Sequence, residues 1–297
     1  MFFVQQGLSL SAVARYLKVD IRVIGRMISR EVEGALESQP LESVTKHALD
    51  ETSSRKGHRW LTILTDLHRK KLVGVSLRKD GEVVRQSLSA MKSRHAKASD
   101  VSVVSMDMSV AFIAEVKGLM PKADVVFDRF HIESILHKAE DEVRREEQRN
   151  TAQPRKSRYL WLRNNRSLNS DQQDSVHYLS KAFPRIGKAY QLKEQFKEIW
   201  NASSFTEGIK TFEAWIVLAR ESMLNPFLEF IKTLENHWYG IREYFQHRVT
   251  NGFAENVNLK IQQIKRIARG YANSANFVNM IYFHLGGLKL SIPNLNG

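Results

Sequence analysis

The stretch Val101–His131, VSVVSMDMSVAFIAEVKGLMPKADVVFDRFH, predicts a strand, a helix and a second strand. Its β-branched start has the length of a strand and ends just before Asp107. The second strand, Val125–Phe127, is followed directly by Asp128. A strand, a helix and a strand with short links form a parallel crossover unit, in which ligands gather at the carboxyl ends of the strands. Both acids therefore fall at the edge where a site is expected, although solvated acids at strand ends remain an alternative.

The composition favours a protein that binds a polyanion. The 297 residues carry 45 Lys and Arg against 32 Asp and Glu, which gives a net charge of +13 and a pI near 9.8. An excess of this size indicates nucleic acid first and an anionic membrane second. No apolar run approaches the roughly 18 residues that cross a membrane, and the start, MFFVQQGLSLSAVA, lacks the basic residues of a signal peptide. Without cysteine the chain has no disulfide and no thiolate metal site, so we expect a bacterial cytoplasmic protein without a membrane partner.

Residues 1–33 predict a helix-turn-helix that binds DNA. Two short apolar stripes at helical spacing lie on either side of Lys18–Asp20, which has the composition of a tight turn. The second helix of such a unit enters the major groove, where Arg22, Arg26 and Arg30 would face phosphates or bases. An ordinary helical hairpin with a basic surface is the alternative. Residues 34–46 are polar, contain Gly34, and are interpreted as a linker.

The following segments predict an α/β fold with a mixed five-stranded sheet. Strands are expected at 47–52, 60–67 and 72–77, a helix at 81–94, and then the strand-helix-strand unit described above. The order β-β-β-α-β-α-β is that of the ribonuclease H-like fold, in which the first and fourth strands are neighbours. We assign residues 47–131 to the first part of this catalytic core.

Two aspartates are brought together by this strand order. Asp50 lies on the first strand and Asp107 follows the fourth, and two carboxylates at one sheet edge repel unless a cation lies between them. We therefore expect a site for two Mg²⁺ or Mn²⁺ ions that promotes phosphoryl transfer. Asp66 is a rival for the first ligand, but it ends an antiparallel strand that points away from this edge and is better explained as a turn residue.

The second half of the chain is mostly helical. Residues 132–247 are interpreted as an all-α insertion, in which the basic segment around Tyr159 and Trp161 suits phosphates and unstacked bases. A solvated face with a buried Trp explains that segment equally well. Residues 248–297 are assigned to the C-terminal part of the core, where Glu255 begins a helix as a third metal ligand or as a charge that favours the helix dipole. The basic face of this helix would contact phosphates through four side chains: Lys260, Lys265, Arg266 and Arg269.

Four segments together resemble the DDE transposases of bacterial insertion sequences, most closely the ISL3 family. They are LDETSSRKGHRWLTILTDL (49–67), VVSMDMSVAFIAEVKGLMPKADVVFDRFHIESIL (103–136), RYLWLRNNRSL (158–168) and NGFAENVNLKIQQIKRIARGY (251–271). The resemblance covers nearly the whole chain. It implies a ribonuclease H-like core interrupted by helices and a catalytic, metal-binding triad of Asp50, Asp107 and Glu255. Asp128 and His131 match a further family motif, and we assign them a supporting role at the edge of the site.

The resemblance also implies a function. A DDE transposase binds the terminal inverted repeats of its element as an oligomer on double-stranded DNA, cleaves there with Mg²⁺ or Mn²⁺, and transfers the strand to target DNA. Family members usually begin with a cysteine zinc-binding module, which this sequence lacks, so a truncated or shortened copy is expected. Two alternatives stay open: an inactive or truncated, repressor-like DNA-binding derivative, and a ribonuclease H-like nuclease.

Overall fold

Two compact units make up the chain. The computed structural model describes residues 1–39, 44–55, 59–77, 84–85, 89, 97–150 and 157–290. The first unit contains residues 1–125 and 249–297, and the second contains residues 126–248. The helix expected at 81–94 lies almost entirely outside the described residues. In the described part of the chain, no helix is both long and apolar enough to span a membrane.

A mixed five-stranded sheet has the order β3-β2-β1-β4-β5. Its strands are β1 (Lys46–Arg55), β2 (Arg59–Asp66), β3 (Lys71–Ser76), β4 (Val103–Met106) and β5 (Asp124–Phe127). The first three strands pair antiparallel, and β1 pairs parallel with β4. The α/β class and the mixed five-stranded sheet expected from the sequence are confirmed, with the first and fourth strands as neighbours.

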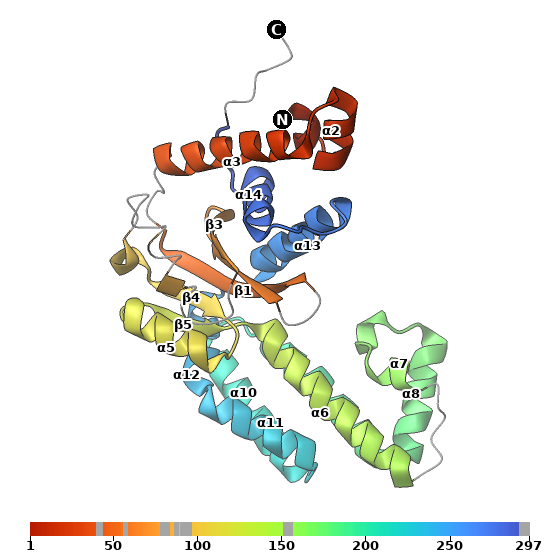
Figure 1. Ribbon diagram of the computed structural model, residues 1–297. Coiled ribbons are helices and arrows are strands. Elements are labelled where there is room, and N and C mark those ends of the chain that lie inside the picture. Colours follow the sequence, from red (N-terminus) through yellow and green to blue (C-terminus); the bar gives the residue numbers. More distant parts are fainter. Residues whose placement is uncertain are drawn as a thin grey trace. The chain divides into compact units, whose positions relative to one another are not determined.

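One face of the sheet is covered by helices from both ends of the chain (Figure 1). Helix α13 (Gly252–Ile267) packs on β1 and β2, whereas α14 (Ser274–Leu285) packs on β3 and on α3 (Ile21–Ser38). A single buried cluster joins Ile28 of α3, Ile63 of β2, Ile261 of α13 and Ile281 of α14. The N-terminal helices therefore share a core with the sheet. The crossover helix α5 (Val110–Leu119) connects β4 to β5.

The N-terminal segment contains the two helices expected from the sequence, and the second is longer. After α1 (Phe2–Gln5), the chain forms α2 (Leu10–Leu17), which has Ser9 as its N-cap, and then α3. The linker expected at 34–46 is wrong over its first residues, because α3 continues through Ser38. Gly34 costs a helix only about 1 kcal/mol, and the burial of Val32 and Ala35 keeps this stretch helical.

The second unit is helical. Its helices are α6 (Arg129–Asn150), α7 (Arg158–Trp161), α8 (Ser170–Ala182), α9 (Pro184–Ile199), α10 (Phe205–Glu221), α11 (Asn225–Asn236) and α12 (Trp238–His247). An aromatic cluster fills its core, where the Phe196 ring lies 4.7 Å from that of Trp215 and 5.4 Å from that of Phe230. Such edge-on aromatic pairs contribute about 0.5–1.5 kcal/mol beyond the area that they bury.

Candidate metal centre and nucleic-acid interface

Asp50 lies on β1, and Asp107 directly follows the neighbouring strand β4. The parallel pairing of β1 and β4 places Ala48 beside Ser105. Two residues further along each chain come Asp50 and Asp107, and both side chains are half-buried. The parallel register therefore places Asp50 beside the carboxyl end of β4, which Asp107 directly follows.

Helix α13 brings Glu255 to the same side. Asn258 of this helix donates a 2.7 Å hydrogen bond from Nδ2 to Oδ2 of Asp50, and the same nitrogen lies 3.4 Å from the carbonyl oxygen of Glu51. Residues three apart lie on the same face of a helix. Glu255, one turn before Asn258 and in the first turn of α13, therefore lies on the face that contacts β1.

Two further side chains of α13 form hydrogen bonds with β1. Gln262 Nε2 donates to Thr52 Oγ1 at 2.7 Å and to the carbonyl oxygen of Ser53 at 2.8 Å. Lys265 Nζ donates to the same carbonyl at 2.8 Å. Lys265 therefore has one of its three N–H donors on the protein backbone, and its contact with phosphate stays a prediction.

The Asp107 carboxylate is tied to the chain that follows it. Its Oδ1 accepts a 2.9 Å hydrogen bond from the backbone N–H of Ser109, the N-cap residue of α5. In the same way Asp50 Oδ1 accepts a 2.8 Å bond from the N–H of Glu51. Each aspartate is thus held in one orientation by the backbone around it.

The three acids offer a donor set that suits a hard divalent cation. Carboxylate oxygens are the ligands that Mg²⁺ and Mn²⁺ prefer, and all three side chains are half-buried, which leaves them accessible. Within the described residues, the oxygens of Asp50, Asp107 and Glu255 are not all within 4.8 Å of one another. The residues fit a cation of this class.

Asp66 lies elsewhere in the sheet. It pairs with His47, whereas Asp50 pairs with Ile63, so the two acids are three residues apart along the strands, about 10 Å. Its Oδ1 accepts hydrogen bonds of 2.8 and 3.0 Å from the N–H groups of His68 and Arg69. Asp66 stabilises the turn between β2 and β3.

Asp128 and His131 form a pair at the start of α6, in the second unit. His131 Nδ1 lies 3.0 Å from Oδ2 of the buried Asp128. This contact orients the imidazole.

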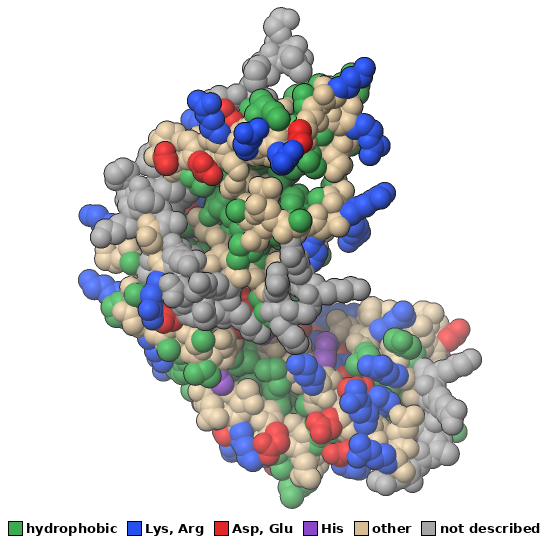
Figure 2. All heavy atoms as spheres, in the orientation of Figure 1, with side chains coloured by type: hydrophobic (Ala, Val, Ile, Leu, Met, Phe, Trp, Pro, Cys, Tyr) green, Lys and Arg blue, Asp and Glu red, His purple; other side chains and the backbone are tan. Residues whose placement is uncertain are grey.

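The basic residues expected to contact DNA lie on exposed surfaces of two helices. Arg22 and Arg26 are exposed on α3 and Arg30 lies further along it, and Figure 2 shows Lys and Arg side chains over α2 and α3, with hydrophobic side chains between them. Val23 and Met27 of the same helix are 37% and 51% exposed, whereas Ile24 and Ile28 are buried. The carboxylate of Asp20 caps α3 by accepting from the backbone N–H of Arg22, and its hydrogen bonds with the Arg22 side chain lower the pKa of that carboxyl to about 2. On α13, the exposed cations are Lys260, Arg266 and Arg269.

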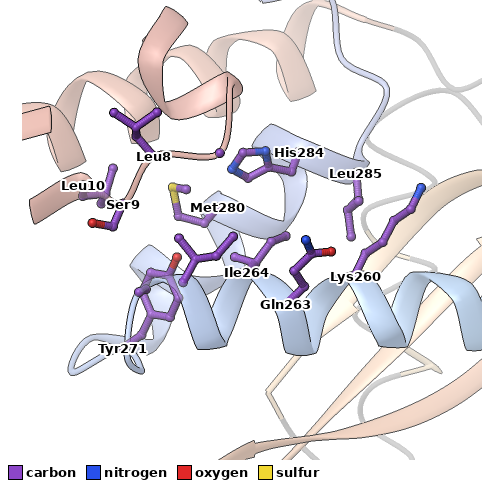
Figure 3. A pocket seen from close by; sticks show the side chains of 13 residues that line it. Leu8, Ser9, Leu10, Lys260, Gln263, Ile264, Tyr271, Met280, His284 and Leu285 are labelled. Atoms are coloured by element: carbon purple, nitrogen blue, oxygen red, sulfur yellow. The ribbon is translucent and has the colours of Figure 1, made fainter. Parts of the chain in front are cut away.

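A separate cavity lies on another face of α13 (Figure 3). Its volume is about 290 Å³, and it lies between the loop around Leu8, Ile264 of α13 and Met280 of α14. No acidic residue is among the described residues that line it. Burial lowers the pKa of His284, which also lines it. The cavity lacks the donor set of a metal centre.

Asn258 and Gln262 were missed by the sequence analysis. Their spacing is a signal that could have found them, because Glu255, Asn258 and Gln262 recur at three and four residues and mark one helical face. Alone, such a polar stripe equally describes a solvated face. Only the packing of α13 on β1 distinguishes the two.

Comparison with known proteins agrees with this architecture. The family model for DDE transposases of the ISL3 type, described as Transposase, matches residues 48–281. The transposase for insertion sequence element IS1001 of Bordetella parapertussis is 23% identical over an alignment 280 residues long. This alignment covers 92% of this chain and 68% of that protein. The transposase for insertion sequence element IS1557 of Mycobacterium tuberculosis is 22% identical over an alignment 316 residues long. This alignment covers 96% of this chain and 70% of that protein.

Proposed function

Because this chain belongs to the ISL3 family of DDE transposases, we propose that it is the transposase of a bacterial insertion sequence. It binds the terminal inverted repeats of its element, cleaves the DNA there and transfers the freed strand to target DNA. The arrangement of Asp50, Asp107 and the α13 face that carries Glu255 is the observation that supports this proposal. The strand order supports assignment of the sheet to the ribonuclease H-like fold.

In this proposal Asp50, Asp107 and Glu255 hold a pair of Mg²⁺ or Mn²⁺ ions. When bound, such ions stabilise the attacking and the leaving oxygen in phosphoryl transfer. The protein's own part is orientation. Asn258 fixes Asp50 and Ser109 fixes Asp107 through the hydrogen bonds described above.

DNA binding is assigned to two basic surfaces. Helices α2 and α3 form the helix-turn-helix, whose Arg22, Arg26 and Arg30 contact phosphates and base edges. The exposed Val23 and Met27 beside them suit contact with thymine methyl groups. Four cations on or just after α13 attract the phosphates near the scissile bond: Lys260, Lys265, Arg266 and Arg269.

The division of the chain into two units supports the domain assignment. In this proposal residues 132–247 are the helical insertion, which interrupts a core made of residues 47–131 and 248–297. In this proposal Asp128 and His131, which match a further motif of the family, have a supporting role. The protein acts in the cytoplasm as an oligomer that pairs two element ends.

A nicking and strand-joining assay tests the function. The DNA carries the ends of the neighbouring element, the buffer contains Mg²⁺ or Mn²⁺, and wild type is compared with Asp107→Asn. Asp100→Asn, an exposed acid of the same unit, is the control. We expect metal-dependent cleavage in the wild type and the control, and its loss in Asp107→Asn with DNA binding retained.

Other outcomes separate the alternatives. Binding without cleavage by the wild type would identify a repressor-like derivative, and cleavage only of RNA-containing duplexes would identify a nuclease. Cleavage that survives Asp107→Asn would overturn the site assignment.

A further inference from the structure

The short basic segment Ser157–Asn169 of the second unit presents its two aromatic residues in opposite ways. Trp161 is 1% exposed, whereas Tyr159, two residues earlier in α7, is 72% exposed. The sequence left open whether this segment is a nucleic-acid surface or a solvated face with a buried Trp. The Trp is buried, and the Tyr is free of the core.

A buried cation holds this segment in place. Lys193 of α9 is fully buried, and its Nζ donates to the carbonyl oxygen of Trp161 and, at 3.1 Å, to that of Arg163. The same Nζ lies 3.1 Å from Oε1 of the buried Glu140 and 4.1 Å from the centre of the Tyr190 ring. Because burying a lysine is costly unless it is paired, this cluster fixes the backbone that carries Tyr159. A fixed platform loses little entropy when it binds a partner.

The surface around Tyr159 is strongly basic. Arg158, Arg163 and Arg166 are exposed, and Ser157–Asn169 contains no acidic residue. The pair of Arg166 with Glu198, at 2.9 Å, is exposed on both sides, whereas Arg158 lies 3.6 Å from the buried Asp141. An exposed pair contributes at most about 1 kcal/mol, so a phosphate can replace Glu198 beside Arg166. Figure 2 shows Lys and Arg side chains gathered on the face that carries α7.

We propose that Tyr159, Arg158, Arg163 and Arg166 form a binding site for a DNA strand with an unpaired base. The Tyr159 ring stacks on the base, and the arginines contact the phosphates on either side of it. An intact duplex covers both faces of each base, so an exposed ring on a fixed platform favours a base that has left the stack. This inference rests on the proposed function, because cleavage and joining at an element end leave unpaired bases there.

Fluorescence anisotropy with a short single-stranded oligonucleotide and with its duplex tests the inference. Tyr159→Ala is compared with Tyr178→Ala, a control on α8 of the same unit with the same 72% exposure. We expect Tyr159→Ala to weaken single-strand binding about tenfold and to leave duplex binding unchanged, and Tyr159→Phe to retain both. Circular dichroism checks that all variants are folded.

A second measurement reports the stacking itself. An oligonucleotide that carries the fluorescent base 2-aminopurine should be quenched by the wild type and by Tyr159→Phe, and not by Tyr159→Ala. Equal behaviour of Tyr159→Ala and Tyr178→Ala in both measurements would overturn the proposal. Single-strand binding through Tyr159 in a protein that does not cleave would support this site and refute the catalytic function, so the two failures are distinguishable.

Discussion

Replacing Asn258 with Asp changes one group at the candidate metal centre while the side-chain shape is kept. In the wild type, the amide Nδ2 donates a 2.7 Å hydrogen bond to Oδ2 of Asp50. In Asn258→Asp, an acceptor stands where the donor was, and two carboxylates face each other. We expect the variant to be less stable in the absence of divalent cations.

The magnitude follows from two terms. A hydrogen bond to a charged group contributes about 1.5–3 kcal/mol. Two like charges about 4 Å apart repel by about 4 kcal/mol at an effective dielectric of 20, and the half-exposed position of both groups reduces this. We therefore expect a loss of about 2–4 kcal/mol in the free energy of unfolding. Acidification should recover part of it, because one carboxylate then takes up a proton.

The assay is urea unfolding at neutral pH, followed by tryptophan fluorescence, with and without Mg²⁺. Asn256→Asp is the matched control, since it adds the same charge to the same part of α13 at an exposed position. Mg²⁺ should stabilise Asn258→Asp more than the wild type, because the added carboxylate offers another oxygen ligand. A loss within about 0.5 kcal/mol of the control, or an equal effect of Mg²⁺ on both proteins, would refute the contact and its place at a cation site.

Three further predictions concern packing and titration. Burial lowers the pKa of His47 to about 4, so the stability that its neutral form contributes is fully present above the unfolded pKa of about 6.5 and is lost toward pH 4. Unfolding experiments should show that the free energy of unfolding changes by up to about 3 kcal/mol over this range in the wild type and not in His47→Leu. An equal dependence of this free energy on pH in the two proteins would contradict the prediction. In Gly208→Ala the added Cβ would collide with the Phe245 ring. We expect this collision to lower the free energy of unfolding by about 1–3 kcal/mol, which calorimetry can measure. An unchanged unfolding temperature would show that the ring is not packed against Gly208. Lys193→Met leaves the buried Glu140 without its cation and should lower the free energy of unfolding by about 3–5 kcal/mol at neutral pH. The double variant with Glu140→Leu should regain most of this loss. A double variant as unstable as the single one would show that the charge pair is not the cause.

Local patterns in the sequence were enough to predict most helices and strands. Alternating or continuous apolar runs mark strands, and spacings of three and four residues mark helices, because each pattern places apolar side chains on one side of an element. The order of these elements then predicted that β1 and β4 are neighbours, which the sheet confirms. Asp107 was identifiable as a candidate for the same reason, since it directly follows a buried strand.

The same patterns failed where a distant contact outweighs a local preference. Gly34 and its polar neighbours predicted a linker, yet α3 continues through Ser38 because Val32 and Ala35 are buried. No local signal separates the buried Trp161 from the exposed Tyr159, because their exposure depends on the position of Lys193 and Tyr190 on another helix.

The sequence by itself was enough to predict most of the secondary structure, the strand order, and Asp50 and Asp107 as candidates for one metal site. The tertiary structure alone decided which side chains hold those acids: Asn258 bonds to Asp50 across 208 residues of chain, and Gln262 and Lys265 continue the contact along β1. The physical reason is that periodicity reports which face of a helix is polar, whereas the partner of that face depends on how the helix packs. Burial then decides whether a polar residue meets water or another side chain.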